Sequence, residues 1–288
     1  RLTRSFSRSE MEALLKSYFL GSISPVAVEA RKLLYWTPDP WGGWTRASAL
    51  LAFPVGASRP LPLVSYQHGT VTRRDDVPSR LNREADAALI MACSGYVAVA
   101  PDYLGLGDSP GFHPYHHARS QASAVVDALR AARQAVRAAG VSLNGQLFLM
   151  GYSQGGYATL AAQREIEADP ASEFRITASA PSAGAYDLSG TVADDFLSGR
   201  VPPNPYLYPY VLSAYVQVYG LAPDLGSLLR APYDSTVPAL YDGSHDSGVI
   251  NAALPARPSE ALRPEVLEAF RSDPEHPLRR ALRENDLY

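Results

Sequence analysis

Cysteine, long apolar runs and charge of one sign are all scarce in this 288-residue sequence. The single cysteine, Cys93, excludes a disulfide within the chain, and no CxxC or Cys/His cluster is present to hold zinc. No apolar stretch reaches the roughly 18 residues that span a membrane. Lys and Arg number 26 against 29 Asp and Glu, so the formal charge is -3 and no basic stripe could neutralise nucleic-acid phosphates. We therefore expect no metal, no cofactor, no transmembrane segment and no nucleic-acid partner.

What the sequence does contain is typical of a folded domain. Hydrophobic residues make up 46% of it and charged residues 19%, which argues against global disorder. The length suits two average domains, or one α/β domain with an insertion. The chain starts at Arg1 rather than at Met, which predicts that it has been processed or cut.

Short apolar runs bounded by Pro or Gly alternate with helical patterns along the first 185 residues. The expected strands cover residues 32–37, 47–55, 61–67, 96–100, 146–150 and 175–180. The expected helices cover 9–20, with a capping box of Ser9 and Glu12, and 80–94, 118–139 and 156–167. Apolar strands spaced by helices are typical of a parallel sheet covered on both faces. The pattern predicts a doubly wound, mostly parallel α/β core over residues 1–185.

Residues 186–288 differ from the first part in composition and in expected secondary structure. The segment 202–223 is rich in Pro and Tyr, and the residues after it read as short helices between prolines, without a further strong strand. We expect this part to be a mostly helical cap inserted into the fold. Its Tyr/Pro patch at 206–219 forms either an acyl-binding wall or ordinary aromatic packing.

A G-x-S-x-G sequence occupies residues 151–155, with Ser153 at its centre. It lies directly after an expected strand and directly before a helix of small residues, which is the setting of a nucleophile elbow. A turn this sharp leaves room only for glycine two positions before and after the serine. The serine hydroxyl would stand at the carboxyl edge of the sheet, at a helix N-terminus that favours a developing oxyanion. The alternative is a Gly-rich turn that binds a phosphate or nothing.

The expected strand at 61–67 runs into His68, Gly69 and Thr70. In folds with a nucleophile elbow, a backbone N–H in the loop after that strand forms half of the oxyanion hole. We therefore expect the N–H groups of Thr70 and Gln154 to form this hole, and His68 to be structural.

Three strings occur in order along the chain: Gln-His-Gly-Thr at 67–70, Pro-Asp-Tyr-x-Gly-x-Gly at 101–107 and Gly-Tyr-Ser-Gln-Gly-Gly at 151–156. Together they resemble the secretory lipase (lipase A-like) and esterase branch of the α/β-hydrolase superfamily, and the resemblance continues through 181–190. It implies hydrolysis of carboxylic esters by a serine nucleophile, under a helical cap that lines an acyl pocket. It also implies a secreted or periplasmic protein.

A serine hydroxyl needs an imidazole to take its proton and a carboxylate to orient that imidazole. In this superfamily the acid and then the histidine follow the serine, each at the end of a later strand. After the serine only His245 and His276 remain, and neither follows an apolar strand. Asp187 and His245 are the candidate acid and base within the chain. Our leading expectation, however, is that the last two strands, with the acid and the base, lie beyond Tyr288, which would leave 175–180 as a proline-free sheet edge.

Three histidines, His113, His116 and His117, lie close together just before the long expected helix. No carboxylate or cysteine stands at ligand spacing from them, so capping or packing is their expected role rather than metal binding.

The leading hypothesis is a serine ester hydrolase acting on short- to medium-chain esters or lipids. Ser153 would attack the acyl carbon, and the amides of Thr70 and Gln154 would hold the oxyanion. An acyltransferase or a peptidase could use the same acyl-enzyme. A non-catalytic binding module that lacks a complete triad is the alternative from another class of protein.

Overall fold

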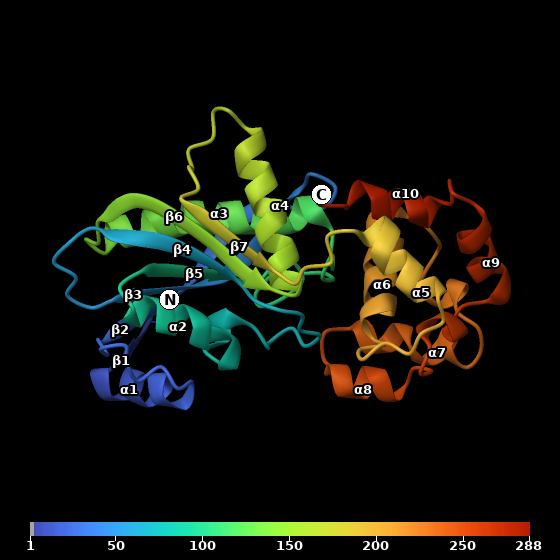
Figure 1. The fold of residues 1–288 in the computed structure, drawn as a ribbon, viewed down its shortest axis with the longest axis horizontal. Coiled ribbons are helices and arrows are strands. Elements are labelled where there is room, and N and C mark those ends of the chain that lie inside the picture. Colours follow the sequence, from blue (N-terminus) through green and yellow to red (C-terminus); the bar gives the residue numbers. More distant parts are fainter. Residues whose placement is uncertain (1–2) are drawn as a thin grey trace.

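The computed structural model describes residues 3–288, which form a seven-stranded sheet with helices on both faces and a second, mostly helical part (Figure 1). The strands are β1 (Thr3–Phe6), β2 (Val28–Pro38), β3 (Trp44–Pro54), β4 (Leu61–Gln67), β5 (Val97–Pro101), β6 (Leu143–Tyr152) and β7 (Ala178–Ser182). The helices of the sheet part are α1 (Arg8–Ser17), α2 (Asp86–Cys93), α3 (Ala118–Ala138) and α4 (Gln154–Ala168). The second part contains α5 (Ala193–Leu197), α6 (Leu207–Tyr219), α7 (Tyr233–Thr236), α8 (Ser247–Ala252), α9 (Pro264–Ser272) and α10 (Pro277–Glu284).

The strand order is β1-β2-β3-β5-β4-β6-β7. The pairs β1/β2, β2/β3 and β3/β5 are antiparallel, whereas β5/β4, β4/β6 and β6/β7 are parallel. It follows that β2, β4, β5, β6 and β7 all point the same way, and that β1 and β3 oppose them. The predicted mostly parallel α/β fold is confirmed. The carboxyl ends of these five strands meet at one edge of the sheet, which faces the helical part (Figure 1).

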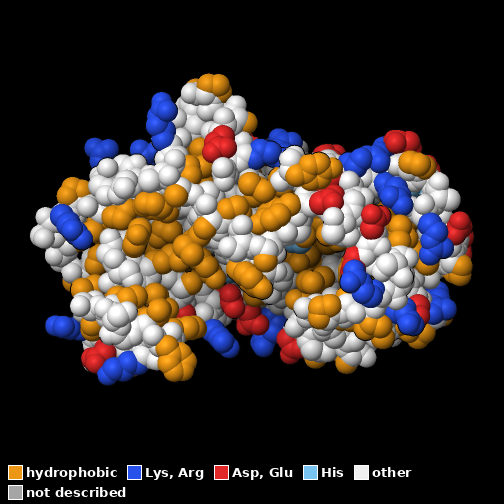
Figure 2. All heavy atoms as spheres, in the orientation of Figure 1, with side chains coloured by type: hydrophobic (Ala, Val, Ile, Leu, Met, Phe, Trp, Pro, Cys, Tyr) orange, Lys and Arg blue, Asp and Glu red, His pale blue; other side chains and the backbone are white. Residues whose placement is uncertain are grey.

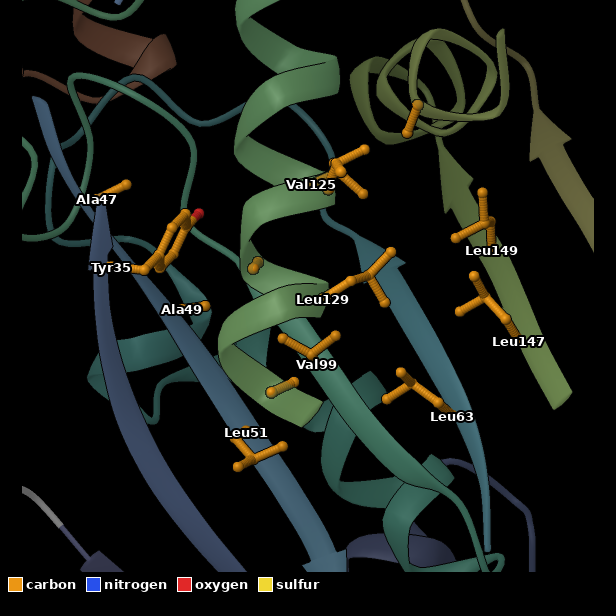
Figure 3. Packing of buried hydrophobic residues seen from close by; sticks show 14 of the residues in the cluster. Tyr35, Ala47, Ala49, Leu51, Leu63, Val99, Val125, Leu129, Leu147 and Leu149 are labelled. Carbon is orange, nitrogen blue, oxygen red and sulfur yellow. The ribbon is translucent and has the colours of Figure 1, made fainter. Parts of the chain in front are cut away.

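Two apolar layers hold the sheet between helices. On one face, alternate residues of β6, Leu147 and Leu149, share a buried cluster with Val125 and Leu129 of α3, as Figure 3 shows. On the other face, α1 and α2 cover β2, β3 and the near parts of β4 and β5. Because side chains alternate across a strand, continuous apolar runs fill both layers.

All six expected strands are present, but the N-terminal region differs from its prediction. The capping box of α1 consists of Ser7 and Glu10, two residues earlier than the predicted pair Ser9 and Glu12. Strand β1 was not predicted, because its sequence Thr-Arg-Ser-Phe lacks an apolar alternation. It forms by pairing with β2, a tertiary contact that a short polar run does not signal.

Strand β7 is the last strand on its side of the sheet among residues 3–288, as predicted for 175–180. It lies slightly later in the chain and contains Pro181, so the expectation of a proline-free edge was wrong. Beside it on β6, Met150 and Tyr152 are 36% and 64% exposed. Hydrophobic side chains gather on this face of the sheet between α4 and α2 (Figure 2).

The helical part is packed largely through aromatic side chains, with Tyr206, Tyr210 and Tyr215 buried in one cluster with Phe270. The last residues of the chain lie beside the first residues of the helical part, where the Leu287 N–H donates to the Tyr186 carbonyl. No helix within residues 3–288 is long and apolar enough to cross a membrane. The division into a core of 1–185 and a cap of 186–288 stays a prediction.

The two-layer packing predicts unequal costs for two leucine truncations. Leu149 is 1% exposed and lies in the α3/α4 layer, whereas Leu34 on β2 is 53% exposed. We expect Leu149→Ala to lower the free energy of unfolding by about 2–5 kcal/mol and Leu34→Ala by less than about 1 kcal/mol. Urea unfolding followed by circular dichroism measures both. Equal losses would contradict the assignment of this core.

Candidate active site

The turn between β6 and α4 places Ser153 at the carboxyl edge of the sheet. Strand β6 ends at Tyr152 and α4 begins at Gln154, so the serine alone makes the connection. Its backbone has φ 59° and ψ -122°. A positive φ of this size is rare for residues other than glycine. The Ser153 N–H donates to the Ser182 carbonyl at 2.9 Å, which ties the turn to β7. The hydroxyl therefore lies at the N-terminus of a 15-residue helix.

The glycines on either side of this turn are required by space. A Cβ on Gly155 would lie 1.9 Å from the Gln67 carbonyl oxygen, and one on Gly151 would lie 2.3 Å from the Gly155 carbonyl oxygen. Both distances are far below van der Waals contact, so no other residue fits. The close approach brings the first turn of α4 against the end of β4.

The second expected half of the site follows β4. Strands β4 and β6 are parallel neighbours with Gln67 opposite Gly151, so the segments that carry Thr70 and Gln154 leave the sheet from adjacent strand ends. Thr70 is half-buried, and its Oγ1 lies 2.9 Å from the Tyr115 hydroxyl. The arrangement is the one in which two backbone N–H groups could face a common oxyanion.

His68 is fully buried beside this loop. Its Nδ1 lies 2.8 Å from the Gly69 carbonyl oxygen, and the Tyr103 hydroxyl donates to the His68 carbonyl at 3.0 Å. Burial lowers the pKa of the imidazole. These contacts suit a structural histidine.

The loop after β5 is held by a buried carboxylate. Asp102 accepts a hydrogen bond from Ser48 Oγ at 2.5 Å and one from the Ser79 N–H at 3.0 Å. Burial raises the pKa of Asp102, and the two hydrogen bonds oppose that shift. The Pro-Asp-Tyr string thus anchors this loop to β3.

The candidate bases lie in other environments. His245 Nδ1 is 3.1 Å from Asp242 Oδ1, in a surface loop before α8. His276 caps α10, where its Nδ1 accepts from the Leu278 N–H at 3.2 Å. Within residues 3–288, no histidine nitrogen forms a hydrogen bond with Ser153.

The candidate acid, Asp187, also has a local role. Its carboxylate accepts from the Gly190 N–H at 2.9 Å and from the Thr191 N–H and hydroxyl at 2.8 and 2.7 Å, and so caps the following turn. These bonds, above all that from the Thr191 hydroxyl, lower the pKa of Asp187. The placement supports neither Asp187 nor His245 as a partner of the serine. An acid and base beyond Tyr288 stay a prediction.

Two contacts of the site were not predicted from the sequence, which assigned His113 to capping or packing and made no prediction for Tyr115. His113 Nε2 lies 2.6 Å from the Gln154 side-chain nitrogen, and Tyr115 contacts Thr70. The sequence holds no local signal for either contact, because their partners are 41 and 45 residues away.

Cavities and metal-binding groups complete the description of the site. An apolar cavity of about 70 Å³ lies within the helical part, lined in part by Phe196, Leu212 and Phe270 and by Tyr208 and Pro209 of the Tyr/Pro patch. Between residues 3 and 288, no group of three or more His, Cys, Asp or Glu side chains could hold a metal ion.

The sheet topology and the strand–serine–helix turn define an α/β-hydrolase. A family model described as "Secretory lipase" matches residues 79–201. The chain is 32% identical to the rice cell wall degrading esterase LipA from Xanthomonas oryzae, with a TM-score of 0.88 over 100% of this chain and 78% of that one. The chain belongs to the secretory lipase family and is a carboxylic ester hydrolase.

Two further structures agree with this placement. A Legionella pneumophila protein classed as a hydrolase is 28% identical, with a TM-score of 0.88 over 100% of this chain and 79% of that one. Lipase A of Candida antarctica, at 19% identity and a TM-score of 0.53 over 82% of this chain and 53% of that one, shares the fold. No curated protein sequence matches the chain.

The space around Gly155 gives a direct test of the elbow. We expect Gly155→Ala to lower the free energy of unfolding by more than about 2 kcal/mol, because the new methyl group would overlap the Gln67 carbonyl. The matched control is Gly21→Ala, where a Cβ meets nothing within 4 Å. Guanidinium unfolding of both variants measures the difference. A Gly155→Ala protein as stable as the control would refute the turn described above.

The buried histidines predict an acid-dependent stability. Burial lowers the pKa of His113 and His117 to about 4 and that of His116 to about 3, against 6.5 for an ordinary histidine. They are neutral in the folded protein, and the unfolded chain binds their protons first. Stability is therefore complete above about pH 6.5 and falls toward pH 4, by up to about 1.4 kcal/mol per pH unit for each histidine.

Unfolding free energies at pH 7.5 and pH 5 test this dependence. The fall should become smaller in His117→Gln, which lacks one of the buried imidazoles. A protein equally stable at both pH values would contradict it.

Proposed function

We propose that this esterase works through an acyl-enzyme on Ser153. The serine oxygen attacks the acyl carbon, its proton passes to a general base, and the tetrahedral intermediate expels the alcohol, which takes up that proton. Water then attacks the ester carbonyl of the acyl-enzyme and releases the acid and the serine. The observation that carries the proposal is the strained turn of Ser153 between β6 and α4, which only the flanking glycines permit.

The backbone N–H groups of Thr70 and Gln154 form the oxyanion hole in this proposal. The helix dipole of α4 adds partial positive charge at the same point. Support comes from the neighbouring ends of β4 and β6 and from the close packing of Gly155 on Gln67. Donors of this kind stabilise charge that develops only in the transition state.

Short- to medium-chain esters or lipids are the proposed substrates. The support for an apolar substrate is the apolar cavity in the helical part, to whose wall the Tyr/Pro patch contributes. Secretion is proposed from the family, and esters of an extracellular polymer are further candidates because LipA of Xanthomonas oryzae is a cell wall degrading esterase.

One observation favours a second candidate function. Since no histidine within residues 3–288 bonds to Ser153, these residues by themselves would bind an ester without cleaving it, and hydrolysis would need an acid and a base from outside them. The two functions differ in the reactivity of the serine, because an unsupported hydroxyl does not react with a phosphonate ester.

Replacing the nucleophile tests the proposal. In the protein that carries its acid and base, we expect Ser153→Ala to lower kcat for p-nitrophenyl esters by on the order of 10⁵-fold while ester binding persists. A fluorophosphonate should label the wild-type protein at Ser153, located by mass spectrometry, and leave Ser153→Ala unlabelled. Ser94→Ala, on the surface of the core, is the matched control.

Two outcomes would count against this function. Full activity of Ser153→Ala would remove the serine from the mechanism. Binding of the ester without labelling or turnover of the wild-type enzyme would favour the binding module. Product analysis with added alcohol or amine separates hydrolysis from acyl transfer.

A further inference from the structure

The loop 112–117, between the β5 loop and α3, contacts both residues of the proposed oxyanion hole. We propose that this loop positions the hole, with His113 fixing Gln154 and Tyr115 fixing Thr70. The inference rests on the proposed function, because it assigns a purpose to contacts around that site. It gives a role to a histidine-rich segment that the reaction itself does not use.

In the contact between His113 and Gln154, the donor and the acceptor can be assigned. His113 Nδ1 lies 2.7 Å from the Leu104 carbonyl oxygen, and only a protonated nitrogen can donate to that oxygen. In the neutral imidazole Nε2 then carries a lone pair, which accepts from the Gln154 side-chain nitrogen at 2.6 Å. Burial keeps the pKa of His113 at about 4, so this polarity holds at neutral pH.

Gln154 depends on that single bond. The side chain is 1% exposed, and its oxygen has no hydrogen-bond partner within residues 3–288. The contact with His113 is therefore the one polar restraint on the side chain in this part of the chain. Since Gln154 is the first residue of α4, holding its side chain also holds the N–H that follows Ser153.

The second contact is braced by aromatic stacking. The Tyr115 hydroxyl lies 2.9 Å from Thr70 Oγ1. Its ring stacks on His116 with centroids 4.1 Å apart and on Tyr210 of α6 at 4.4 Å with an interplanar angle of 6°. Two stacked rings thus hold Tyr115 in place, and its contact with Thr70 links that residue to the helical part.

The two contacts come from residues that are close together in the sequence. His113 and Tyr115 are separated by Pro114 alone, and proline restricts the backbone between them. One short rigid segment therefore sets the position of both proposed donors, which come from two different strand ends. An oxyanion hole acts only when its donors are aimed at the transition state, and a misplacement of about 1 Å can cost about 10²-fold in rate.

Matched tyrosine variants test the proposal. Tyr115→Phe keeps the ring stack and removes the hydroxyl that contacts Thr70. Tyr35→Phe removes a buried hydroxyl that donates to the Ala124 carbonyl at 2.9 Å, outside the loop 112–117 and away from both donor residues. We expect Tyr115→Phe to lower kcat for p-nitrophenyl esters about 10- to 100-fold with KM within twofold, and Tyr35→Phe to leave both unchanged.

A second pair of variants tests the histidine. His113→Ala should lower kcat, and His113→Gln, whose side-chain oxygen can accept from Gln154, should restore part of it. His117→Ala is the control, because His117 Nδ1 contacts Ser120 Oγ at 3.0 Å rather than a donor residue. In a Thr70→Val background, Tyr115→Phe should cause no further loss.

The outcomes separate this proposal from the proposed function. If Ser153→Ala abolishes turnover but Tyr115→Phe matches Tyr35→Phe, and His113→Ala matches His117→Ala, the loop only packs and the positioning role is overturned. If Ser153→Ala retains turnover, the serine mechanism itself fails. A fall in kcat equal for all four loop and control variants, accompanied by equal losses of thermal stability, would also overturn the positioning role.

Discussion

The close approach of α4 to the end of β4 is the constraint on which the rest of the site depends. Gly155 lies so near the Gln67 carbonyl that a single methyl group would not fit between them. That contact sets the sharpness of the turn, and the turn places Ser153 in a left-handed conformation at the helix N-terminus. The two buried layers on either side of the sheet supply the stability against which this strained conformation is held.

Much of the fold was predictable because its strands are short apolar runs whose ends are marked by Pro and Gly. The elbow was predictable for the same reason: its requirement for glycine is local, and Gly151 and Gly155 express it in the sequence itself. The proposal that Thr70 and Gln154 supply the oxyanion hole rests on their positions in the sequence, after β4 and directly after Ser153. Six of the seven strands and the family of the chain agree with these local signals.

What the sequence did not reveal depends on contacts between distant segments. Strand β1 is polar and exists through its pairing with β2, and the edge strand β7 extends past Pro181 to Ser182 because it pairs with β6. His113 was expected to cap or pack and Tyr115 was not singled out, since nothing near them in the sequence indicates that Gln154 and Thr70 lie within hydrogen-bond distance. Asp187 looked available, yet the N–H groups of the next turn occupy its carboxylate.

The central claim is that Ser153 and the N–H groups of Thr70 and Gln154 act on one carbonyl group. A crystal structure of the enzyme inactivated by a phosphonate ester tests it most directly, because the phosphoryl oxygen stands in for the oxyanion. The account predicts phosphorus bonded to Ser153 Oγ and the phosphoryl oxygen about 2.7–3.1 Å from both nitrogens. An adduct on another residue, or an oxygen directed away from both N–H groups, would contradict it.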